Sequence, residues 1–262
     1  MTSSIEVGVA GVGLFMPGFP TAADWRAGRA SDEPELPTGS RLDRRARGRS
    51  SVLTKALAEA YFEAADAAGV ELGKGSAVFG SALGEVGTML GLLNQMWRDH
   101  EEPSPMAFAL SVHNAASGIV SIATKNRGFT TSLGADHDTP AMALMEAIGL
   151  IAERGEPVVV VCGEEPTPTA LVPDDEAWEL ATMAIALAPL SDHDDGTPVR
   201  LRGPFKVAPT LTGPELRPML ARNPQVGLLD LICAIEAGKS GTIALDRGRG
   251  AGWCMEVLVA DG

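Results

Sequence analysis

Residues 139–162 read TPAMALMEAIGLIAERGEPVVVVC, and this stretch decides the fold class. Apolar residues recur at helical spacing in its first part, which predicts a helix over 139–153. Asp138 or Thr139 is the expected N-cap, and Gly155 is expected to end the helix. The run PVVVVC has no polar alternation, which is typical of a strand buried on both faces. A helix leading into such a strand predicts an α/β protein with a largely buried sheet.

The rest of the chain supplies further strands and helices in alternation. Residues 17–49 are expected to be irregular, with a turn at Pro103 and Pro105, and the apolar segment 178–188 fits a strand or a helix. We expect helices at 50–68, 89–97, 115–125 and 228–237, strands at 5–12, 77–79, 129–133, 242–245 and 254–259, and a turn at 191–197. The expected fold is a mixed sheet covered by helices.

Composition restricts the class of protein. The chain has 34 acidic and 21 basic residues, and a net charge of -13 argues against a nucleic-acid partner. No segment reaches the roughly 18 to 20 apolar residues of a membrane helix, and the N-terminus lacks a basic leader, so we expect a cytoplasmic protein without membrane contact. Cys162, Cys233 and Cys254 are far apart in apolar runs, which predicts buried thiols and no disulfide or metal set.

Two motifs suggest catalysis or nucleotide binding but fit other roles better. The run GVAGVG at 8–13 resembles a dinucleotide fingerprint, yet prolines follow where that motif needs a helix. Ser132, His137 and Asp138 supply the residue types of a triad, but triads are assembled from separate loops. We therefore expect Asp138 to cap a helix and His137 to be an exposed loop residue.

Two further polar runs have structural interpretations. The run DHDD at 192–195 lacks the spacing of a calcium loop, which predicts a solvated turn without a metal ion. The run SVHN at 111–114 precedes a helix of small residues, and Asn114 is its expected N-cap.

Residues 105–165 resemble the N-terminal half of a β-ketoacyl synthase, a thiolase-fold enzyme of fatty-acid and polyketide assembly. In that family an Asn opens a helix that leads to a Gly, and a short strand then reaches the nucleophilic cysteine. A long Ala-rich helix and another strand follow. This chain has the same order: Asn114, a helix to Gly128, FTTSL at 129–133, AMALMEAIGLIAERGE at 141–156 and PVVVVCGEE at 157–165.

The resemblance extends over about residues 5–190 and implies a thiolase-like half-domain. VGVAGVGLFMPG at 7–18 resembles the opening strand of the family, and the Arg-rich segment from Arg41 resembles its lead into the first helix. The likeness points to short chain-length-factor-like subunits of aryl-polyene-type and related clusters. We expect one domain over 1–262, with 1–190 as the thiolase-like half and 191–262 as a shortened return that closes the sheet.

Departures from the family pattern bear on the activity. Counting back from Ile148, the family's nucleophilic cysteine falls near Gly134 or Ala135, and neither carries a nucleophile. Claisen chemistry in this fold needs a thiolate that holds the acyl chain, and Cys162 lies mid-strand. The family's catalytic histidines and lysine lie in its C-terminal half, but only His193 follows residue 190 here. We expect no catalytic residue, no cofactor and no metal, with an acyl-binding pocket lined by His113, Ser132, Gly134, Ala135 and His137.

The resemblance implies a non-catalytic partner subunit of an active ketosynthase. In the family the strand equivalent to 129–133 pairs across the subunit boundary, so we expect a hetero- or homodimer. The basic stretch Arg41–Arg49 is either a solvated segment or a docking site for an acidic acyl carrier protein. Two alternatives stay open: a cysteine-independent acyl-thioester decarboxylase or hydrolase that uses His113 or His137, and a free-standing binder of acyl ligands.

Overall fold

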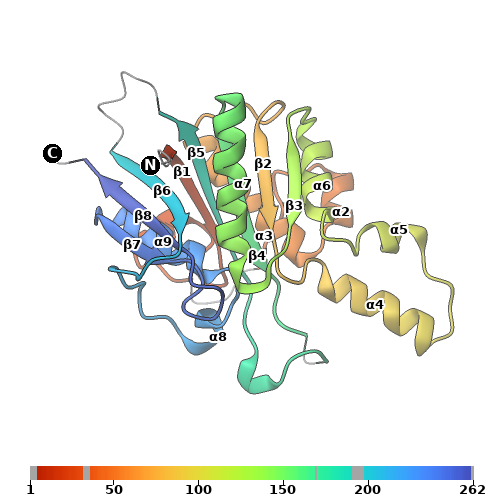
Figure 1. Cartoon of the computed structure of the whole chain (residues 1–262). Helices are drawn as coiled ribbons and strands as arrows, with labels where there is room; N and C mark the ends of the chain where they lie inside the picture. Colours follow the sequence, from red (N-terminus) through yellow and green to blue (C-terminus); the bar gives the residue numbers. More distant parts are fainter. Residues whose placement is uncertain (1–4, 32–35, 169, 191–197, 261–262) are drawn as a thin grey trace.

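A computed structural model describes residues 5–31, 36–168, 170–190 and 198–260 (Figure 1). Its strands form one eight-stranded mixed sheet in the order β3-β2-β4-β5-β1-β6-β8-β7. β2 is parallel to β3 and β4, and the other neighbouring pairs are antiparallel. The strands are β1 Glu6–Phe15, β2 Ser76–Gly80, β3 Thr130–Leu133, β4 Val158–Glu164, β5 Ala181–Pro189, β6 Val199–Phe205, β7 Gly241–Ala244 and β8 Cys254–Val259.

The sheet is buried on both faces because alternate side chains of its central strands enter two cores. In β4, Val160 and Cys162 face one core, whereas Val159 and Val161 face the other. The first core lies beneath α1 Ala22–Arg26, α7 Thr139–Arg154, α8 Pro218–Ala221 and α9 Val226–Glu236. The second lies beneath α2 Arg44–Arg49, α3 Val52–Ala67 and α6 Ala115–Thr124. The α/β fold with a mixed, helix-covered sheet is therefore confirmed.

The glycines of β1 allow α3 to lie directly on the sheet. A Cβ atom at Gly13 would be 2.1 Å from the Ala60 carbonyl oxygen. β1 then continues to Phe15 and ends in a turn closed by hydrogen bonds between Met16 and Phe19. Because no helix begins directly after the glycines, the GVAGVG run serves close packing and not pyrophosphate binding.

The helices α4 Val86–Trp97 and α5 Pro105–Ala109 form an arm, residues 86–109, that projects from the β3 side of the sheet (Figure 1). Only Val86 and Leu92 of α4 are buried, and no residue of α5 is buried. The arm therefore adds little to the two cores. Two short 3-10 helices, η1 Asp136–Asp138 and η2 Asp174–Glu176, complete the regular elements.

Differences from the sequence predictions are local. Residues 17–49 were expected to be irregular, but α1 and α2 form there; Asp43 caps α2 by accepting the N–H groups of Arg45 and Ala46. The expected turn near Pro105 instead starts α5, which is capped by Ser104. β6 was not predicted, and the ambiguous segment 178–188 contributes β5.

Residues 198–260 extend the same sheet beyond β1, since β6, β8 and β7 follow it in order. The turn expected at 191–197, with its DHDD run, lies outside the described residues. Among the described helices, none combines the length and the apolar character needed to cross a membrane.

Candidate functional site

The turn between β3 and α7 lies where the resemblance places the family's nucleophile. Gly134 and Ala135 follow β3 and lead through η1 into α7. Asp136 has a φ of 51°, in the left-handed region that is strained for most residues other than glycine. The sharp bend of the chain is therefore at Asp136, one residue beyond the predicted pair. The sequence has no cysteine between residues 130 and 140.

His113 lies against this turn. Its Nε2 atom is 3.3 Å from the carbonyl oxygen of Ala82, in the loop after β2. A Cβ atom at Gly134 would be 3.2 Å from the same nitrogen and 2.6 Å from the Ser81 carbonyl oxygen. The close approach of this loop explains why residue 134 is glycine. The structure thus brings together two of the five predicted pocket residues, His113 and Gly134.

Ser132 and His137 line two different hollows. The Ser132 hydroxyl is 2.8 Å from that of Ser117, in a hollow of about 410 Å³ between α6 and β3. His137 lines a hollow of about 500 Å³ that also contains Arg222 and Arg249. Within the described part of the chain, no hydrogen bond joins Ser132 to either His113 or His137, so the arrangement is not a triad.

His137 is half-buried, not exposed as predicted. The loop between β7 and β8 covers this end of α7, and its Ala251 N–H donates to Asp138 Oδ1 at 2.8 Å. Burial is the main cause that lowers the pKa of His137. The imidazole is therefore largely neutral at pH 7.

Both predicted N-cap positions are confirmed, but the two side chains do not cap their helices. Asn114 and Asp138 occupy the N-cap positions of α6 and α7, but neither side chain accepts an N–H of its helix. The Asp138 carboxylate instead accepts the Ala251 N–H. The Thr139 hydroxyl accepts the Ala135 N–H at 2.9 Å and donates to the Asp136 carbonyl at 2.7 Å, so it holds the sharp turn in place.

The cysteines are core or near-core residues. Cys162 is fully buried in β4, and desolvation raises the pKa of its thiol, which keeps it protonated and unreactive. Cys254 is buried as predicted, whereas Cys233 is only half-buried and accepts the Trp25 indole N–H at 3.3 Å. Across the described ranges, no group of three or more His, Cys, Asp or Glu side chains is placed to hold a metal ion.

Carboxylates at the end of β4 are functional candidates that the sequence reasoning missed. Glu164 is fully buried, accepts the Ser81 hydroxyl at 2.9 Å and the Gln225 amide at 3.0 Å, and also accepts the Ala82 N–H. Burial raises the pKa of Glu164 to about 7 against the opposing effect of these donors. The signal available in the sequence was the pair of charged residues directly after the apolar run VVVVCG.

Among the described strands, β3 lies at one edge of the sheet, and no described strand pairs with its outer side. The Phe129 and Leu133 carbonyls accept hydrogen bonds from residues at the two ends of β2, Ala77 and Ser81. Because backbone groups alternate in direction along a strand, the N–H and C=O groups of Thr130 and Ser132 face outward. Such an open edge is a template for pairing with another chain.

Apolar side chains are exposed on the same side of the molecule as β3. Ile122 of α6 is 77% exposed, and Trp97 and Phe108 of the arm are 69% and 64% exposed. Figure 1 shows α6 and the arm on the β3 side, at the opposite end of the sheet from β7. Large apolar groups gathered on one side of a protein indicate an interaction surface.

In the basic stretch, some arginines form an ion pair with a described residue and others do not. The Arg41 guanidinium pairs with Asp66 and lies 4.4 Å from the centre of the Phe62 ring. Four arginines of α2 are exposed, and no ion pair joins them to a described residue: Arg44, Arg45, Arg47 and Arg49. α2 contacts α6, so this basic surface lies near the β3 edge.

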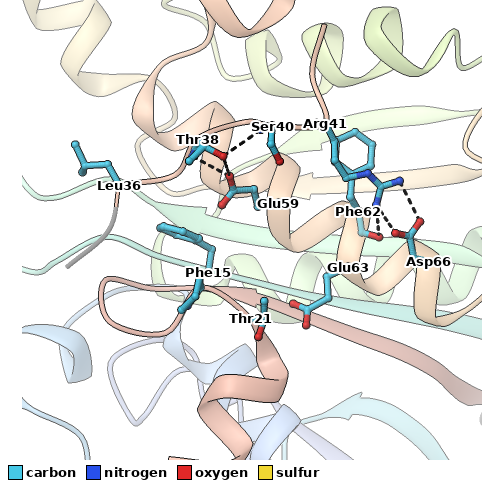
Figure 2. A pocket seen from close by; sticks show the side chains of 11 residues that line it. Phe15, Thr21, Leu36, Thr38, Ser40, Arg41, Glu59, Phe62, Glu63 and Asp66 are labelled. Atoms are coloured by element: carbon cyan, nitrogen blue, oxygen red, sulfur yellow. Dashed lines mark hydrogen bonds and ion pairs between the residues drawn. The ribbon is translucent and has the colours of Figure 1, made fainter. Parts of the chain in front are cut away.

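Acidic side chains line a hollow of about 400 Å³ beside α3 (Figure 2), but these carboxylates already accept hydrogen bonds or form an ion pair. Glu59 accepts the N–H groups of Thr38 and Gly39. Glu63 accepts those of Leu14 and Ala22, which holds the loop after β1 on α3. These bonds give the hollow a structural role, and it carries no argument for catalysis.

Comparison with known proteins identifies the family. Residues 23–226 match the family model described as β-ketoacyl synthase, N-terminal domain. The chain belongs to the β-ketoacyl synthase family. No curated protein matches it. This ketosynthase-family chain is also similar in fold to several solved structures, each at 19% sequence identity or lower.

One similar structure is a ketosynthase (ApeO) in complex with its chain length factor (ApeC) from Xenorhabdus doucetiae. The TM-score is 0.63 at 19% identity, and the match covers 97% of this chain and 99% of that chain. A second is the ishigamide ketosynthase/chain length factor, with a TM-score of 0.58, 19% identity and coverage of 76% and 66%. A third is a type II PKS acyl-carrier protein in complex with its ketosynthase, with a TM-score of 0.57, 12% identity and coverage of 71% and 64%. The fold is therefore thiolase-like.

Proposed function

We propose that this chain is a non-catalytic, chain-length-factor-like partner of an active ketosynthase in cytoplasmic type II polyketide or fatty-acid-type biosynthesis. The open β3 edge, flanked by exposed apolar side chains, is the observation that carries the proposal. A four-residue edge with outward backbone groups at Thr130 and Ser132 suits a partner strand.

The turn after β3 supports a non-catalytic role. Gly134 and Ala135 have no nucleophile, and the strained position is occupied by Asp136. The fully buried Cys162 has a raised pKa and offers no thiolate. An acyl chain therefore has no thiol to which it can be transferred at this turn.

The arm supports a role in shaping the partner's acyl pocket. Trp97 and Phe108 present large apolar surfaces on the arm, which lies on the β3 side of the sheet (Figure 1), where a bound ketosynthase would cover them. Reconstituted condensation with an active ketosynthase and carrier protein tests this role. We expect Phe108→Ala to change the length of the product, whereas Met219→Ala, at another exposed apolar residue, in α8, leaves it unchanged. Identical products from both variants would contradict it.

The basic surface of α2 supports docking of an acidic acyl carrier protein. The protein as a whole is strongly acidic, so four exposed arginines without a described ion pair create a local attraction for an acidic partner. We expect the double change Arg45→Glu and Arg49→Glu to weaken carrier binding, most clearly at low salt. The control is Lys239→Glu, at an exposed residue after α9. Equal affinities of the two variants for the carrier protein would contradict docking at α2.

The rival function is a cysteine-independent acyl-thioester decarboxylase or hydrolase. The position of His113 against the Gly134 turn is the observation that favours it, together with a largely neutral His137 that is able to act as a base. Incubation of the isolated chain with malonyl- and acyl-thioesters decides between the two functions. Turnover that is lost in His113→Ala or His137→Ala, with the fold intact, would establish the enzyme.

A further inference from the structure

The arm is fastened to the sheet mainly at its base. Its helices bury only Val86 and Leu92, and its exposed apolar residues contribute nothing to the two cores. Two segments join the arm to the fold: residues 110–114, which lead into α6, and the base, residues 81–87, which link β2 to the first turn of α4. Three carboxylates hold the base, and they come from two places far apart in the sequence.

Glu164 holds the first half of the base. Its carboxylate accepts the Ser81 hydroxyl and the N–H groups of Ala82 and Leu83. The Ser81 oxygen in turn accepts the Gly84 N–H at 2.8 Å. Four consecutive residues are therefore fixed, directly or through Ser81, by one buried side chain at the end of β4.

Glu165 and Glu85 hold the second half. Glu165 Oε1 accepts the Gly87 N–H, in the first turn of α4, at 2.7 Å. Glu85 is 2% exposed, and its Oε1 accepts the Thr54 hydroxyl of α3 at 2.5 Å. The base of the arm is thus tied both to the end of β4 and to α3.

We propose that Glu85, Glu164 and Glu165 form a proton-sensitive clamp that fixes the arm and allows it to open as a local unit while the sheet stays folded. Segments with few buried apolar contacts open locally at a lower cost than core elements. Opening would change the surface that meets a ketosynthase, a consequence that rests on the proposed function. The clamp itself is a property of the isolated chain.

The charges around the clamp favour proton uptake. The groups that face it are Cys162 of β4, His113 in the loop before α6, the Gln225 amide and the three carboxylates themselves. In the described part of the chain, none of the three carboxylates forms an ion pair with a Lys or Arg.

Among the described residues, none donates a hydrogen bond to two buried acceptor oxygens at the clamp, Glu85 Oε2 and Gln225 Oε1. A protonated Glu164 can donate to the Gln225 oxygen once that amide turns. Burial raises the pKa of all three carboxylates, and that of Glu164 to about 7.

The direction of the pH effect follows from the coupling between protonation of Glu164 and opening of the arm. The closed arm holds the Glu164 proton more tightly than an open arm, in which the hydrated carboxyl returns toward its ordinary pKa of 4.5. Opening therefore becomes more favourable as the pH rises through the interval between these two values. For a closed-state pKa of about 7, the opening constant increases about tenfold between pH 6 and pH 8.

Hydrogen exchange of the full chain, read by mass spectrometry, tests the clamp. In Glu165→Ala we expect amides of the arm to exchange about tenfold faster, as loss of a charge-assisted hydrogen bond implies. Exchange of α7 should be unchanged, and the control Glu156→Ala, at an exposed carboxylate before β4, should behave as wild type. Unchanged arm exchange in Glu165→Ala, or equal acceleration of the arm and α7, would overturn the proposal.

A pH series provides the second test of the clamp. After correction for chemical exchange rates, wild-type arm exchange should rise about tenfold from pH 6 to pH 8. Glu164→Gln should reduce that rise to less than threefold. A wild-type arm that does not respond to pH overturns proton sensitivity, even if Glu164→Gln fails to fold. None of these measurements needs a ketosynthase, so failure of the clamp and failure of the proposed function are distinguishable.

Discussion

Substitution of Thr130 by proline tests the outward edge of β3 with little disturbance of the fold. Thr130 is the first residue of β3, where proline is tolerated, and its N–H faces away from β2. Thr130→Pro therefore removes one donor to the partner strand and leaves the β2–β3 hydrogen bonds in place. Thr130→Val is the matched control, because both changes remove the hydroxyl that accepts the long 3.4 Å bond from Ser121.

The magnitude follows from the lost bond and the acceptor left behind. A backbone hydrogen bond contributes about 1 kcal/mol net, and an unpaired buried carbonyl on the partner costs about 2 kcal/mol more. A loss of about 3 kcal/mol weakens binding about a hundredfold. The dissociation constant for the ketosynthase, measured by titration calorimetry or interferometry, should rise by that factor in Thr130→Pro and by less than threefold in Thr130→Val. Equal affinities would refute strand pairing at this edge.

Three further predictions concern chemistry and stability. Incubation with acyl carrier protein or a cerulenin-type electrophile should leave the intact mass unchanged, and a stoichiometric thioester would contradict the non-catalytic role. His113→Ala should cost about 1 kcal/mol or less in urea unfolding, because its hydrogen bond is long and the ring exposed; His137→Ala should likewise leave a folded protein, and a larger loss would assign either ring a core role. Arg247→Ala leaves Asp230, 3% exposed, without its cation and should cost about 3 kcal/mol. The control Arg26→Ala breaks an exposed pair and should cost under about 1 kcal/mol; similar losses in both would contradict the reasoning.

Local sequence patterns were enough to predict the strands and helices that have a regular pattern of burial. Every residue of β4, Val158–Glu164, is buried, and the helical spacing after residue 139 matches α7. β6 was missed because its charged residues alternate with Leu201, and their pairing is visible only in three dimensions. Arg202 bonds to Glu256 of β8 at 2.7 Å and lies 3.7 Å from Glu6 of β1.

The site was only partly accessible from the sequence, because its contacts join distant residues. The family resemblance placed the turn after β3 to within one residue of Asp136. It gave no indication that Asp138 would accept an N–H from Ala251, 113 residues away, and so leave α7 without a side-chain cap. The bond between Glu164 and Gln225 spans 61 residues and is equally invisible to a local pattern.

The mass of the complex in solution tests the proposed partner role most directly. The chain and an active type II ketosynthase are mixed at micromolar concentrations, and sedimentation equilibrium gives the mass and the stoichiometry. We predict a one-to-one complex that forms through the β3 edge and is weakened by Thr130→Pro. A wild-type chain that remains a monomer in the presence of the ketosynthase would contradict the proposal.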